Sequence, residues 1–166
     1  LDQLKLRAGW GLTGNYSVDI YSTKNLLETG TTVHGSQGST EYITPTKLAN
    51  SGIGWEMTTQ YNVGLDFSVL KGRISGVLDV YQNFTDGLIF EVSLPTVSGY
   101  ENTDDNVGKT RNYGFDLTIN SVNISNRDFS WNSTLNLSYN DNRILELQNG
   151  KVDMPDDGLF IGQPIN

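Results

Sequence analysis

The sequence predicts an all-β fold, a section of an antiparallel transmembrane β-barrel. Two observations predict it. Apolar residues recur at every second position in five segments, and the connections alternate between short turns and long polar stretches. Because strand side chains point alternately to opposite faces, each segment would have one apolar and one polar face. Helical spacing competes nowhere over a comparable length.

The predicted strands are, in order, 4–10, 61–69, 73–83, 112–120 and 129–140. The clearest alternation runs from Tyr61 to Val69, where aliphatic and aromatic residues alternate with Asn, Gly, Asp and Ser. The segment 73–83 is less regular. We expect a sixth strand to start at Leu159-Phe160-Ile161.

The connections favour a barrel in the outer membrane. Residues 69–73 and 121–128 form short turns, whereas 12–54, 88–109 and the residues from Asp141 onward are long, irregular and rich in Gly, Ser, Thr and Asn. Compact soluble domains seldom contain structureless loops longer than about 15 residues. Outer-membrane barrels combine short periplasmic turns with long extracellular loops.

The two faces of the predicted strands support the same interpretation. The polar face is mostly Asn, Ser, Thr, Gly and Asp, which suits a hydrated lumen. Aromatic residues lie near the strand ends, as in the aromatic girdles of membrane barrels: Trp10, Tyr61, Phe67, Tyr113, Phe129, Trp131 and Tyr139. The alternative is that these aromatics form the core of a soluble β-sandwich, a glycan-binding or adhesion module.

Composition excludes several classes of function. The chain has 11 Lys and Arg against 19 Asp and Glu, a net charge of −8, which argues against a nucleic-acid partner. It has no cysteine, hence no disulfide, thiolate zinc site or cysteine nucleophile. His34 is the only histidine, so a catalytic triad or a histidine metal site lacks partners. We expect no enzyme, although a β-rich hydrolase with a carboxylate pair is a third alternative.

Two motifs resemble ligand sites only in part. Residues Gly9 to Gly14 match the G-x-G-x-x-G dinucleotide fingerprint, but no amphipathic helix follows them. Residues Asp153 to Gly158 and Asp104-Asp105-Asn106 resemble incomplete calcium loops. We therefore expect no cofactor, with structural Ca²⁺ in the loops as the alternative.

These strands are too few to close a barrel, since single-chain membrane barrels start at about eight strands. An open edge within lipid would leave backbone groups unpaired at several kcal/mol each. We therefore expect residues 1–166 to be one partial barrel domain of a longer polypeptide; the alternative is that other chains close the barrel.

The run from Leu4 to Asn15 resembles a segment of the SusC/RagA-type TonB-linked outer-membrane transporters. Further pieces follow in that family's order: Trp55-Glu56, Tyr61 to Phe67, Arg73 to Gly76, Asp79 to Tyr81, Leu94-Pro95, Ser98 to Tyr100, Asn106 to Gly108, Asn112 to Phe115, Phe129 to Trp131, Asn136 to Asn140 and Ile161 to Ile165. Together they span nearly the whole chain.

The resemblance implies an outer-membrane barrel of about 22 strands that encloses a plug. It also implies energy from TonB, a SusD-like lipoprotein that lids the barrel, and an oligosaccharide or oligopeptide substrate. Plug and TonB contact would lie outside these residues, which would form part of the C-terminal half of the barrel wall.

Candidate substrate-binding residues follow from the predicted faces and loops. Lys5, Arg7, Asp66, Asp79 and Asp116 would line the hydrated lumen. Two loop aromatics, Tyr42 and Tyr100, could stack on sugar rings or pack against a lid; the alternative is that each only orders its own loop.

Overall fold

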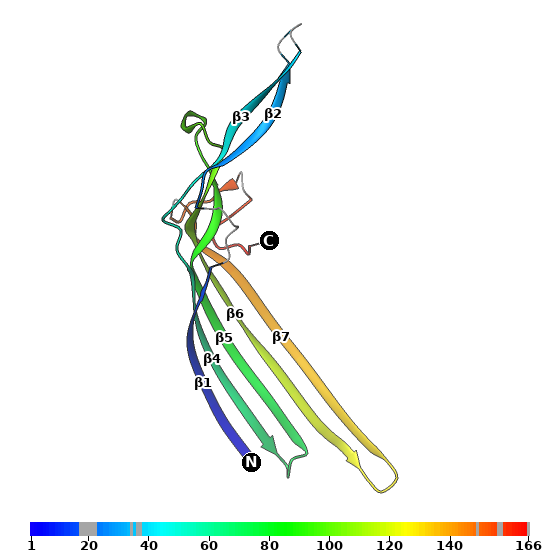
Figure 1. Cartoon of the computed structure of the whole chain (residues 1–166). Coiled ribbons are helices and arrows are strands. Elements are labelled where there is room, and N and C mark those ends of the chain that lie inside the picture. Colours follow the sequence, from blue (N-terminus) through cyan, green and yellow to red (C-terminus); the bar gives the residue numbers. More distant parts are fainter. Residues whose placement is uncertain (17–22, 34, 36–37, 149, 156–157, 166) are drawn as a thin grey trace.

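All strands of the computed structural model join in one curved sheet (Figure 1). The structure describes residues 1–166 except 17–22, 34, 36–37, 149, 156–157 and 166. The elements are β1 (Gln3–Asn15), β2 (Leu26–Val33), β3 (Ser39–Leu48), β4 (Glu56–Val69), β5 (Ile74–Ser93), the short 3₁₀-helix η2 (Thr96–Ser98), β6 (Asn102–Ser125) and β7 (Ser130–Glu146). In the described part of the chain, no helix is long and apolar enough to span a membrane.

The sheet order is β1-β4-β5-β6, and β6 then pairs with β7 along most of its length. These neighbours are all antiparallel. Beyond the end of β7, β3 makes a short parallel pairing with β6, and β2 pairs with β3. The β2–β3 hairpin therefore extends past one end of the long strands, whereas the short turns and the N-terminus lie at the opposite end (Figure 1).

All five predicted strands are confirmed, each longer than the pattern indicated. They correspond to β1, β4, β5, β6 and β7. The two short turns are also present. Leu70, Lys71 and Gly72 all have positive φ in the first turn, and in the second Asn126 donates its backbone N–H to the Phe129 carbonyl over 2.8 Å. The whole Gly9–Gly14 motif lies inside antiparallel β1, which is not the setting of a dinucleotide site.

Three loop predictions were wrong in part. The 12–54 stretch contains the β2–β3 hairpin, much of 88–109 belongs to β5 and β6, and β7 continues past Asp141 to Glu146. In the 88–109 stretch, the alternation of apolar and polar residues fails because β-bulges interrupt the register between Asp86 and Ile89. The expected strand at 159–161 is absent: Leu159 makes one isolated bridge to Met154, and a turn follows.

The register separates an apolar face from a polar face across five strands. One row of directly opposed leucines crosses β1, β4, β5, β6 and β7, namely Leu6, Leu65, Leu78, Leu117 and Leu137. No second sheet covers this face among the described strands, and Leu6 is 73% and Leu137 52% exposed. The leucines therefore do not form the core of a β-sandwich, and that alternative is wrong.

Aromatic residues bound the apolar face. Trp10 opposes Tyr61, with Tyr113 two strands further along the same row, and Trp131 lies near the other end. Trp131 and Tyr139 are eight residues apart on β7, about 26 Å along the strand at ~3.3 Å per residue. At a tilt of ~40° this spans about 20 Å along a barrel axis, close to the ~25 Å apolar band of outer-membrane barrels.

Candidate solute-facing site

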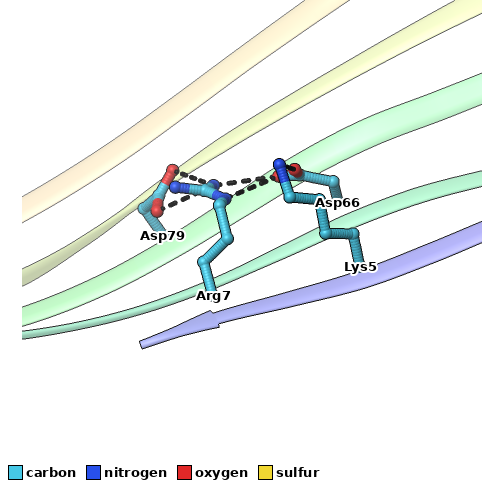
Figure 2. A network of polar contacts seen from close by, with 4 residues as sticks. All are labelled: Lys5, Arg7, Asp66 and Asp79. Carbon is cyan, nitrogen blue, oxygen red and sulfur yellow. Dashed lines mark hydrogen bonds and ion pairs between the residues drawn. The ribbon is translucent and has the colours of Figure 1, made fainter. Parts of the chain in front are cut away.

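Four charged side chains form a cluster on the polar face of β1, β4 and β5 (Figure 2). In the register, Lys5 opposes Asp66, and Arg7 opposes Gly64, which in turn opposes Asp79. Alternate positions on a strand share a face, so all four side chains project from the side opposite the leucine row. We call these four residues the wall cluster.

Arg7 is the centre of the wall cluster. Its guanidinium donates from Nε and Nη2 to Asp66 Oδ1 over 3.1 and 2.9 Å, and from Nη2 to Asp79 Oδ2 over 3.1 Å. Lys5 Nζ lies 3.9 Å from Asp66 Oδ2. The Arg7 side chain is 36% exposed and the two carboxylates 27% each. The guanidinium is thus held by two carboxylates and still reaches solvent.

Gly64 allows Arg7 to reach across β4 to Asp79. A Cβ at this position would lie 2.5 Å from Asp79 Oδ1 and 2.6 Å from Arg7 Cζ. On β6, Gly114 has the same role for Tyr81 of β5. The Tyr81 side chain crosses Gly114, and its hydroxyl donates to Asn140 Oδ1 of β7 over 3.3 Å. The alternation of polar and apolar residues does not reveal the role of these glycines. The available signal was a glycine on the polar face of a strand whose neighbouring residues on that face are Asn, Asp, Ser or Thr.

Asp116 lies beside the wall cluster without joining it. It directly opposes Asp79 on one side and Ser138 on the other. Within the described residues it forms no salt bridge, and its side chain is exposed. The structure therefore brings together four of the five predicted lumen residues, and it leaves the Asp116 carboxylate facing the solvent on the same wall.

The two predicted loop aromatics lie in different surroundings. Tyr42, on β3, is 46% exposed and covers Gly30 on β2, where a Cβ would lie 2.5 Å from its ring. Tyr100 is half-buried just after η2 and lines an open groove of about 420 Å³ with Thr44 and Pro45 of β3. Among the described residues, Tyr42 does not line that groove.

A second ionic cluster, which the sequence pattern did not predict, fixes the β2–β3 hairpin to the long strands. Lys47 Nζ lies 2.7 Å from Asp104 Oδ1 and 3.5 Å from Glu91 Oε2. The side chains of Lys47 and Asp104 are only 14% and 11% exposed. Burial by itself lowers the pKa of Lys47, but the hydrogen bond and charge of Asp104, with the charge of Glu91, outweigh it and raise that pKa above 10.5. Lys47 is therefore charged at neutral pH.

The residues of the candidate calcium loops have protein partners. Asp104 pairs with Lys47, and Asp105 Oδ1 accepts from Asn50 Nδ2 over 3.2 Å and from the Asn106 N–H over 2.9 Å. No group of three metal-ligating side chains occurs within the described ranges. His34 and the Asp156–Asp157 part of the second loop lie outside the described residues. Calcium binding stays a prediction.

Comparison with known proteins identifies the family. The model of the "TonB dependent receptor-like, beta-barrel" family matches residues 1–166. The chain belongs to this family. It is 37% identical over 155 residues to TonB-dependent receptor P26 of Formosa agariphila, and 36% identical over 154 residues to TonB-dependent receptor SusC of Bacteroides thetaiotaomicron. These alignments cover 93% and 90% of the chain.

Solved structures agree with this TonB-dependent receptor assignment. The RagAB peptide importer in the open-open state superimposes with a TM-score of 0.78 at 26% identity over 97% of the chain. The RagAB peptide transporter gives 0.76 at 27% identity, also over 97%. The chain spans 15% of the length of the two receptors and 18% of the RagAB chains. It is thus a barrel section in a family of receptors and transporters.

Proposed function

We propose that this section forms part of the wall and mouth of an outer-membrane TonB-dependent transporter that imports oligosaccharides or oligopeptides. The observation that carries the proposal is the family match over residues 1–166, on a sheet with one apolar and one polar face. The apolar face would contact lipid and the polar face the lumen and the plug. TonB coupling is inferred from the relative named TonB-dependent receptor SusC, and a peptide substrate from the RagAB peptide importer. The plug and an oligosaccharide substrate follow from the sequence resemblance described above.

The wall cluster suits a hydrated passage more than a catalytic site. Both carboxylates that face Arg7 are occupied by that guanidinium, so neither is poised as a nucleophile or proton donor. Asp116 presents a carboxylate to the lumen and is the candidate for contacts with a solute or with the plug. Tyr42 and Tyr100 are candidates for contacts at the mouth.

Transport is tested with the full-length protein in its own cells. Growth on an oligosaccharide or oligopeptide as the sole carbon source should require both this protein and TonB. Import against a concentration gradient needs energy, and TonB supplies it from the inner membrane. Growth that persists after either gene is removed would contradict the transport proposal.

The β2–β3 hairpin is the candidate contact for a SusD-like lipoprotein lid. It extends beyond the long strands at the loop end (Figure 1). Leu27 and Ile43 are 64% and 67% exposed and share one face of the hairpin, since Leu27 opposes Pro45 and Ile43 opposes Thr29. Exposed apolar residues on a projecting element are typical of protein–protein contacts.

The lid proposal is tested by co-purification from the outer membrane. We expect Leu27→Glu and Ile43→Glu to lower recovery of the lipoprotein with the full-length receptor. Thr40→Glu is the matched control, because Thr40 lies on the opposite face of the same hairpin. Equal recovery for all three variants would show that this face does not contact the lid.

A further inference from the structure

Four basic side chains surround one pocket where the C-terminal end of β7 pairs with β6. The pocket has a volume of about 390 Å³, and Lys109, Arg111, Arg143 and Lys151 line it together with a single carboxylate, Glu146. The whole chain has a net charge of −8 with only 11 basic residues. A concentration of positive charge in so acidic a chain indicates a local requirement for an anion.

The pocket lies on the apolar face of the sheet, just beyond the aromatic row. Arg111 opposes Arg143, and the next pair of residues on that face is Tyr113 and Asp141. Arg111 Cζ lies 4.9 Å from the centre of the Tyr113 ring, which places the guanidinium on the same side as that ring. If the apolar face contacts lipid, as proposed above, this level is that of the lipid headgroups in the outer leaflet.

The positive charges of Arg111 and Arg143 are only partly neutralised by neighbouring carboxylates. Like charges directly opposite one another destabilise a sheet. Arg143 Nε donates to Asp141 Oδ2 over 2.8 Å. Arg111 forms no salt bridge among the described residues, and its Nε is buried without a hydrogen-bond partner. A buried donor without an acceptor is costly, and an oxyanion between the two guanidiniums would remove both penalties.

We propose that this pocket binds the phosphate group of an outer-leaflet lipid. A phosphate monoester carries up to two negative charges and three acceptor oxygens, which match two guanidiniums. Arg111 and Arg143 hold the phosphate, and Lys151 lies at the exposed rim. Lys109 Nζ already lies 3.2 Å from Asp86 Oδ1 and 3.5 Å from Glu146 Oε2, so the charge of Lys109 is largely neutralised within the protein. Phe115 and Tyr139 lie further along the apolar face from the pocket, and their stacked rings would contact the acyl chains of the lipid.

The test uses the full-length receptor in phosphatidylcholine vesicles, with and without phosphatidic acid as the phosphate monoester lipid. We expect phosphatidic acid to raise the unfolding temperature, and Arg111→Gln to weaken its retention about tenfold, the equivalent of one charge-assisted hydrogen bond. Arg127→Gln, an exposed arginine in the turn at the opposite end, is the matched control. Equal retention by the Arg111→Gln and Arg127→Gln variants would overturn the proposal.

Stability without the ligand separates binding from a merely structural role. In phosphatidylcholine alone, Arg111→Gln should not lower the unfolding temperature, because it removes a repulsion and an unsatisfied donor. A lower unfolding temperature there would mean that Arg111 is structural, and would count against the site. Inorganic phosphate distinguishes the source of the anion: if it stabilises the wild type as well as phosphatidic acid does, the site takes a soluble phosphate and the lipid assignment is wrong.

Discussion

Several long side chains of this sheet lie over glycines of a neighbouring strand. Arg7 and Tyr81 cross Gly64 and Gly114 on the polar face to reach the next strand but one. On the apolar face Phe67 covers Gly76, where a Cβ would lie 2.6 Å from its ring. Glycine weakens a strand when nothing packs on it, and a covering side chain restores that packing. These glycines are therefore positions at which one methyl group changes a specific contact.

Replacement of Gly64 by alanine should break the Arg7–Asp79 contact and leave the strand pairing intact. The added methyl would overlap both side chains, so at least one of them must move away. We expect a lower unfolding temperature for the full-length protein, and we expect Asp79→Asn to add little in the Gly64→Ala background because the contact is already lost.

Gly9→Ala is the control for that substitution. Gly9 is on the same face of β1, two residues from Arg7, and a Cβ there meets nothing within 4 Å. Alanine in a strand interior is otherwise favoured over glycine by up to about 1 kcal/mol. If the two alanine variants unfold alike, Gly64 has no role in the wall cluster.

The position of the leucine row on the apolar face predicts that these leucines lie near the middle of the bilayer. Leu65→Arg and Leu117→Arg each place a charge near the middle of the apolar face, at a cost of about 2–4 kcal/mol if that face contacts lipid. We expect poor assembly of both variants in the outer membrane, measured by the yield of folded full-length protein. Ser138→Arg, on the polar face beside Asp116, should assemble normally. Normal assembly of the two leucine variants would contradict the assigned facing.

At the level of elements, the sequence predicted the strands where the two faces meet different surroundings. From Tyr61 to Val69, alternation survives because one face is apolar and the other polar. Past the aromatic row the pattern disappears, since bulges near Gly87 change the register and polar residues occupy both faces. The β2–β3 hairpin could not be predicted from the sequence because polar residues occupy both of its faces here too. Residues Thr29 to Thr32 on β2 show almost no alternation of apolar and polar residues.

The candidate site was predictable only in part. Alternation alone put Arg7, Asp66 and Asp79 on one face, and in the structure the three side chains contact one another through Arg7. It could not show which side chains pair, because the pairing depends on the offset between strands in space. The contact of Lys47 with Asp104 joins residues 57 positions apart through a parallel pairing that no local pattern reveals.

The Lys47 contact predicts how firmly the hairpin is held. Lys47→Met leaves the nearly buried Asp104 carboxylate without its cation, at a cost of about 1–3 kcal/mol. We expect faster hydrogen exchange of the hairpin amides 26–33 and 39–48 in the full-length protein, whereas Lys24→Met, at an exposed lysine before the hairpin, should leave exchange unchanged.

Alkaline pH should act in the same direction as Lys47→Met. Because the folded state raises the pKa of Lys47, its stabilisation is complete below 10.5 and is lost as the pH rises through that raised pKa. Hairpin exchange, corrected for the intrinsic rate, should therefore increase above pH 10.5 in the wild type and change little in Lys47→Met. A wild-type transition well below that pH would implicate another group.

As a whole molecule, the described sheet exposes far more surface than a globular chain of its size. A folded monomer of 18.3 kDa exposes about 8,100 Å². This chain exposes 11534 Å². Much of the excess is the uncovered apolar face, and β1 has a free edge along the sheet. Lipid and further strands would cover both in a complete barrel.

The chain expressed alone should therefore not behave as a soluble domain. Without detergent we expect the 166 residues to aggregate through the apolar face and the strand edges. Size-exclusion chromatography with light scattering measures this directly. A monodisperse folded monomer in buffer would contradict the assignment of the apolar face to lipid.

The facing of the sheet is tested most directly by spin labels on adjacent residues of the full-length receptor in bilayers. This section contributes no native cysteine, and single cysteines are introduced for labelling at Leu65 and Asp66 on β4 and at Leu117 and Asp116 on β6. We predict collisions with lipid-dissolved oxygen at the two leucine positions and their near absence at the two aspartate positions. The same accessibility at all four positions, or the reverse alternation, would contradict the account.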